Sequence, residues 1–122
     1  MSRLYQPIKN NPYRLRDSVY YWVVMAIRSV GRDAIGYYDA ECLQEYRPPQ
    51  NHVEAVNTAL QEVPEEYRQV VYENTAFETA LPAEYRNKAT TLVKAKFIYR
   101  VAELLEYPLG AKEIVHVEYD WR

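Results

Sequence analysis

The chain has 122 residues, 48% of them hydrophobic and 26% charged, and a formal net charge of −2. This length suits one domain with its own core, and the composition excludes an intrinsically disordered chain and a strongly basic protein. The single cysteine, Cys42, excludes an internal disulfide and a zinc site built from cysteines, so we expect a reducing, cytoplasmic setting. The longest apolar run, Val19–Ile27, is too short to span a bilayer, and the first residues lack the apolar region of a secretion signal. We therefore expect no membrane partner.

The charges are divided into blocks along the chain. Residues 1–32 carry six basic residues and one acidic residue, residues 33–85 carry two basic and eleven acidic, and residues 86–100 carry five basic and none acidic. Two interpretations are open: the basic blocks bind an anionic partner, or they neutralise the acidic middle within the fold. The 13 tyrosines also indicate a partner surface, because tyrosine is enriched at interfaces.

The first half of the chain predicts two helices. Tyr13–Val30 is apolar on most of its circumference, which is typical of a central helix, and Gly31 suits the position just after a helix end. Asp33–Tyr46 predicts a weaker helix, which Pro48 and Pro49 bring to an end.

The second half predicts four more helices. Asn51–Val63 begins with a capping box, in which Asn51 is the cap and Glu54 stands three residues later. Pro64 begins the next helix, Pro64–Asn74, at its first position. A short helix at Pro82–Asn87 and a long one at Thr90–Tyr107 follow, the latter capped by Thr90 or Thr91.

The tail Glu113–Trp121 alternates apolar and polar residues, which predicts a strand. Its partner would be Leu4–Ile8 or a second subunit. The predicted fold is thus mainly α, a bundle of five to six helices with a short terminal β-strand pairing and without internal repeats. We expect an N-terminal helical segment, 1–50, and a C-terminal segment, 51–122, to form one compact domain.

The long helix Thr90–Tyr107 combines an apolar stripe with cationic and hydroxyl-bearing residues between its apolar positions. Together with Pro64–Asn74 and Pro82–Asn87 it forms a helix-turn-helix-like unit, in which the third helix reads the major groove of DNA.

The same region resembles the C-terminal half of phage late-transcription regulators of the RinA/ArpU type, and more distantly the helix-turn-helix of sigma factors. The resemblance rests on Val63-Pro64 and Arg68 in the bracing helix, and on Thr90-Thr91-Leu92, Lys94, Lys96 and Val101–Leu105 in the long helix. The connecting segment Thr75–Lys88 departs from the family pattern, because Pro82 falls where a positioning helix is usual. The resemblance implies a DNA-binding transcription regulator, acting as a homodimer on double-stranded DNA, with RNA polymerase or another host protein as a further partner.

Under this resemblance, the DNA-facing residues are basic, hydroxyl-bearing or aromatic. They are Arg86, Lys88, Thr91, Lys94, Lys96, Tyr99 and Arg100. The lysines and arginines would contact phosphates or guanine edges, and Thr91 the backbone or a thymine methyl group. The alternative is a solvated cationic face without a ligand.

Catalytic motifs are missing from the sequence. Neither His52 nor His116 has a nucleophile at a readable spacing, no glycine-rich phosphate loop exists, and no metal-ligand spacing is present. We therefore expect no enzyme activity, no cofactor and no metal.

The alternative function is a non-catalytic, phage-encoded protein that binds and inhibits a host protein through an acidic, tyrosine-rich surface, as a nucleic-acid mimic does. A well-formed positioning helix within Thr75–Lys88 would favour DNA binding, and an irregular connection would favour protein binding.

Overall fold

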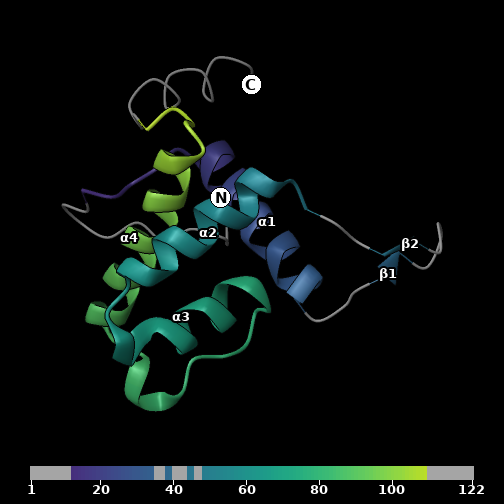
Figure 1. Ribbon diagram of the computed structural model, residues 1–122. Helices are drawn as coiled ribbons and strands as arrows, with labels where there is room; N and C mark the ends of the chain where they lie inside the picture. The colour runs from purple at the N-terminus through teal and green to yellow at the C-terminus, as the bar shows by residue number, and fades with distance from the viewer. Residues whose placement is uncertain (1–11, 35–37, 40–43, 46–47, 110–122) are drawn as a thin grey trace, which may run out of the picture.

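The computed structural model describes residues 12–34, 38–39, 44–45 and 48–109, and these are mainly helical. In chain order the elements are α1 (Asp17–Ala34), β1 (Tyr38–Asp39), β2 (Gln44–Glu45), α2 (Gln50–Glu62), α3 (Glu65–Ala76), the 3₁₀ turn η1 (Ala83–Tyr85) and α4 (Lys88–Leu104). Figure 1 shows the four α-helices gathered into one body, with the strand pair to one side of it. The predicted mainly-α class is confirmed.

Helix α1 is the centre of the core, because it contacts α2, α3 and α4. Its buried residues extend around most of the helix, as the sequence predicted, and Val19, Val23 and Ile27 are completely buried. Residues from both halves of the chain join these in a single core cluster. The other helices contribute chiefly Val56 and Ala59 from α2, Val71 from α3, and Phe97, Ile98 and Val101 from α4.

Helix α1 does not end where its glycine predicted. It begins at Asp17 rather than Tyr13, and it continues through Gly31 to Ala34. Gly31 is buried, and a Cβ there would lie 3.1 Å from Cβ of Ala76 and 3.0 Å from Cε1 of Phe77. The missing side chain therefore lets α1 and the end of α3 approach closely, and this packing keeps glycine within the helix despite its low helix propensity.

The helix starts follow prolines and Asn87 rather than the predicted caps. Pro49 takes the N-cap position of α2 without a side-chain hydrogen bond, so Asn51 lies within the helix and the predicted capping box does not form. Pro64 is the N-cap residue of α3. In α4 the cap is Asn87, whose Oδ1 accepts the N–H of Thr90 at 2.8 Å. A fixed proline φ angle and an Asn side chain thus cap α2 two residues and α4 three or four residues before the expected positions, whereas α3 begins one residue later than predicted.

The predicted helix Asp33–Tyr46 is wrong. Its first two residues end α1, and within it Tyr38 pairs with Glu45 and Asp39 with Gln44 in an antiparallel ladder. Glycine at position 36 lowers helix stability by about 1 kcal/mol relative to alanine, and tyrosine favours strands, so strand pairing competes well with a helix here.

The predicted count of five to six helices is not supported. The described residues form four α-helices, and Pro82–Asn87 forms only the single 3₁₀ turn η1. Pro82 takes the N-cap position of that turn, and the carbonyls of Pro82 and Ala83 accept only short-range bonds from Tyr85 and Arg86. The predicted strands Leu4–Ile8 and Glu113–Trp121 lie outside the described residues. Within the described part of the chain, no helix is both long and apolar enough to cross a membrane.

Helix α4 ends with a Schellman motif that contains no glycine. The N–H of Tyr107 donates to the carbonyl of Ala102 at 3.0 Å, and the N–H of Glu106 to that of Glu103 at 3.1 Å. This places Glu106 at a φ of 62°, where side chains with a Cβ are strained and glycine is favoured.

Replacing Glu106 by glycine is expected to raise the free energy of unfolding by about 1 kcal/mol, because it removes the left-handed strain. Glu106→Ala is the matched control, since it removes the same charge from the helix C-terminus but keeps the Cβ. Urea denaturation of the three proteins measures the difference. Equal stability of the Gly and Ala variants would contradict the strain argument.

Candidate functional site

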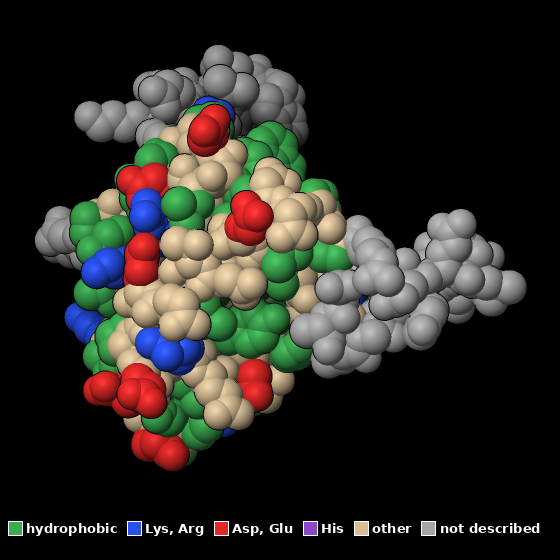
Figure 2. All heavy atoms as spheres, viewed as in Figure 1, with side chains coloured by type: hydrophobic (Ala, Val, Ile, Leu, Met, Phe, Trp, Pro, Cys, Tyr) green, Lys and Arg blue, Asp and Glu red, His purple; other side chains and the backbone are tan. Residues whose placement is uncertain are grey.

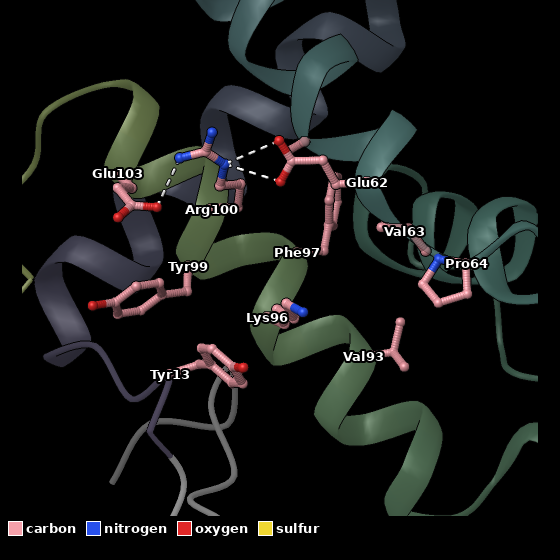
Figure 3. A pocket seen from close by; sticks show the side chains of 11 residues that line it. Tyr13, Glu62, Val63, Pro64, Val93, Lys96, Phe97, Tyr99, Arg100 and Glu103 are labelled. Carbon is pink, nitrogen blue, oxygen red and sulfur yellow. Dashed lines mark hydrogen bonds and ion pairs between the residues drawn. The ribbon is translucent and has the colours of Figure 1, made fainter.

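The candidate site is a groove of about 350 Å³ between the end of α2, the α2–α3 turn and α4. Its apolar surface comes from Val63 and Pro64 on one side and from Val93 and Phe97 of α4 on the other (Figure 3). Ala59 of α2 also lines it. This volume is at the small end of the range of about 300–1,000 Å³ for ligand pockets. It is large enough to receive apolar side chains from a partner.

The rim of the groove carries a cluster of charges that are paired within the protein. Arg100 Nε donates to both carboxylate oxygens of Glu62, at 3.0 and 3.3 Å, and its Nη1 donates to Oε1 of Glu103 at 2.8 Å (Figure 3). The hydrogen bonds to Glu62 and then Glu103 raise the pKa of Arg100 above its usual value. The guanidinium is therefore committed to acceptors within the protein, and it stands beside the groove as part of a charge cluster.

Two tyrosines and a lysine complete the groove. The rings of Tyr13, which precedes α1, and Tyr99 of α4 meet edge to face with centroids 5.6 Å apart. Lys96 also lines the groove, and its side chain is exposed. Three of the residues expected to face DNA, Lys96, Tyr99 and Arg100, thus meet at this groove.

Lys94, by contrast, lies on a different face of α4. Each residue of an α-helix turns the chain by about 100°, so Lys94 and Lys96 point roughly 160° apart. Lys94 Nζ donates to Oδ1 of Asn74 on α3 at 2.7 Å. Burial, and secondarily the nearby charge of Arg28, lower the pKa of Lys94. The structure therefore does not bring Lys94 together with the groove residues.

The remaining predicted DNA contacts gather at the start of α4. Arg86, Lys88 and Thr91 are exposed there. Arg86 Nε donates to the carbonyl of Leu81 at 2.8 Å, and Thr91 Oγ1 to that of Asn87 at 3.0 Å. The seven predicted residues thus fall into three places: the start of α4, the groove, and the packed face that holds Lys94.

The segment that connects α3 to α4 is irregular. Helix α3 ends at Ala76, and the only regular structure before Lys88 is the turn η1. The positioning helix of a helix-turn-helix unit is therefore not formed between them.

No family model, curated protein or solved structure matches this chain. The resemblance to phage regulators consequently stays a prediction that rests on its motif residues. Among the described residues, no group of three or more His, Cys, Asp or Glu could hold a metal ion.

The sequence analysis missed a short repeat that the structure makes evident. Val63–Arg68 reads VPEEYR and Leu81–Arg86 reads LPAEYR. In each copy the arginine reaches back to the carbonyl of the residue before proline: Arg68 Nη2 donates to Val63 at 3.0 Å and Arg86 Nε to Leu81 at 2.8 Å. The expectation of no internal repeat is therefore wrong, and the recurring Pro-x-Glu-Tyr-Arg was the signal available in the sequence.

The two copies of this motif contact each other. The rings of Tyr67 and Tyr85 meet edge to face with centroids 5.9 Å apart, and the hydroxyl of Tyr85 donates to the carbonyl of Glu66 at 3.0 Å. The motif also contributes the exposed carboxylates Glu65, Glu66 and Glu84. Residues 63–68 and 81–86 together thus form one acidic cluster at the surface.

Replacing Arg28 by methionine is expected to raise the pKa of Lys94 toward its ordinary value, because one nearby positive charge is removed. The rise should be partial, since burial is the larger cause of the lowered pKa. An NMR titration of the lysine side chains measures it, with Arg86→Met as the matched control. An unchanged Lys94 titration in Arg28→Met would contradict the charge contribution.

Proposed function

We propose that this chain is a non-catalytic protein-binding module, which takes an apolar side chain of its partner into the groove between α2 and α4. The observation that carries the proposal is the combination of an open apolar groove and a charge cluster already fixed at its rim. Apolar pockets bordered by fixed polar groups are typical of interface hot spots, where the apolar anchor supplies affinity and the rim supplies orientation.

The exposed charges favour a partner with basic residues beside its apolar anchor. Among the acidic residues whose burial is described, all except Glu73 are exposed. Five basic residues, by contrast, are half-buried: Arg16, Arg28, Arg68, Lys94 and Arg100. Figure 2 shows acidic side chains gathered at the lower end of the molecule, over the start of α3 and η1. Complementary charge on a partner would steer its approach and fix its orientation.

The irregular connection between α3 and α4 also supports protein binding over DNA reading. Helix-turn-helix proteins hold the reading helix against DNA with a preceding helix that crosses the backbone. Here η1 has three residues, Ala83–Tyr85, and α4 devotes Arg100 to internal acceptors.

Val93→Glu is expected to abolish or weaken partner binding by at least about ten-fold, because a carboxylate in the apolar groove must be desolvated by an incoming side chain. Peptides selected from a random display library on the wild-type protein supply the probe, and we expect them to carry an apolar residue flanked by Lys or Arg. Fluorescence anisotropy measures their binding.

Leu92→Glu is the matched control for this experiment. Leu92 is the preceding residue of α4, it is 41% exposed, and it does not line the groove. The proposal predicts that Leu92→Glu binds like the wild type. Equal loss in both variants, or none in either, would rule out the groove as the binding site.

A second candidate function is DNA binding through exposed cations at the start of α4 and at the groove. It is favoured by the exposure of Arg86, Lys88 and Lys96, and within the described residues neither lysine forms an ion pair. These three cations would supply weak, salt-dependent phosphate contacts.

If this second function holds, affinity for random duplex DNA falls as salt rises, and Lys88→Ala with Lys96→Ala lowers the slope of log K against log salt by about 1.8. Lys94→Ala should leave the slope unchanged, because Lys94 is half-buried and bonded to Asn74 on a different face of α4. Anisotropy titrations at several salt concentrations measure both. Absence of binding at low salt would exclude this function for the isolated protein.

A further inference from the structure

A second cavity, of about 240 Å³, lies among α1, α3 and the residues that follow α3. It is separate from the groove and shares no lining residue with it. Its polar lining includes Arg28 from α1, Asn74 from α3, Glu78 just after α3, and Lys94 from α4. Two cations from different helices thus share one cavity with a single carboxylate.

The two cations have more hydrogen-bond donors than acceptors here. Lys94 Nζ has three donors, and among the described residues only Oδ1 of Asn74 accepts from it, at 2.7 Å. Arg28 Nη2 pairs with Oε2 of Glu78 at 2.9 Å, while its Nε is buried and has no acceptor in the described part of the chain. Buried donors without acceptors are costly, and an anion between the two side chains would satisfy them.

The cavity is arranged before any ligand arrives. Asn74 Nδ2 donates to the carbonyl of Thr79 at 2.8 Å, which keeps the amide oxygen directed at Lys94. The side chain of Arg28 is only 21% exposed, so its position is set by packing along α1. Preorganised donors in a partly desolvated site bind anions more strongly than flexible surface lysines do.

Glu78 is the exchangeable member of the cavity. Its side chain is 67% exposed, so its ion pair with Arg28 is open to solvent and weak. Its backbone has a φ of 57°, a strained conformation for a residue with a Cβ. A soluble anion that binds Arg28 therefore displaces only the weakly bound carboxylate of Glu78.

We propose that Arg28 and Lys94 bind a small oxyanion, a phosphate or carboxylate group, which replaces Glu78 on the Arg28 guanidinium. The planar guanidinium offers two parallel donors to such a group, and the lysine offers a point charge from the opposite helix. The volume of about 240 Å³ exceeds what one bound water needs, so an inorganic phosphate or a small carboxylate can enter.

Isothermal titration calorimetry with inorganic phosphate, and separately with acetate, tests the site at ionic strength held constant with chloride. We expect saturable binding to the wild-type protein, weakened at least about ten-fold in Lys94→Met because a charge-assisted hydrogen bond is lost. Lys96→Met, a change of the same type on an exposed lysine two residues away, should bind like the wild type. Tighter phosphate than acetate binding assigns a phosphate-bearing ligand, and the reverse order assigns a carboxylate.

Glu78→Gln gives a second reading that does not depend on changing a packed residue. Removing the competing carboxylate should tighten oxyanion binding several-fold while leaving the fold intact, because Glu78 is largely exposed. The proposal is overturned if neither the wild-type protein nor Glu78→Gln binds either anion saturably. It is also overturned if a folded Lys94→Met variant binds as well as the wild type.

Discussion

The burial of α1 is the constraint on which the rest of the structure depends. Its valines and Ile27 are covered by α2, α3 and α4 together, and each such side chain contributes roughly 1.5–3 kcal/mol when it is fully buried. Each of the other three helices covers one side of α1, so each buries only one face in the core. Their opposite faces form the surface of the molecule, and the groove lies there between the end of α2, the α2–α3 turn and α4.

This packing also decides what each basic residue of α4 can do. The helix turns Lys94 toward α1 and α3, where it bonds to Asn74 and lines a cavity with Arg28, and turns Lys96 and Arg100 toward α2. A block of five cations in the sequence therefore becomes several separate environments in the fold. One lysine is drawn into a polar cavity, one arginine is held by two glutamates, and the cations at the start of the helix face solvent. Basic residues that are close along a helix share one surface only when their spacing places them on the same helix face.

The sequence predicted the mainly-α class and the positions of α2 and α3 to within two residues, because prolines and apolar spacing mark those helices clearly. It failed where tertiary contacts override local preference. Gly31 suggests a helix end, but the fit against Ala76 and Phe77 retains it within α1. On α4, the apolar Leu92 is 41% exposed while the polar Thr90 is buried. The angle at which the helix packs on α1 decides this, and the residues of α4 alone do not determine that angle. The groove draws on three separate segments, so no local pattern could have revealed it.

Gly31 has one further consequence, which concerns electrostatics rather than packing. The ring of Phe77 lies over this glycine, and the next residue, Glu78, pairs with Arg28, one helical turn before Gly31 on the same helix. A Cβ at residue 31 would force Ala76 or Phe77 to shift, and Glu78, the next residue, would shift with them relative to Arg28. The packing of Phe77 on Gly31 and the ion pair of Glu78 with Arg28 therefore depend on each other. The energetic effects of changes at residues 31, 77 and 78 are accordingly expected not to be additive.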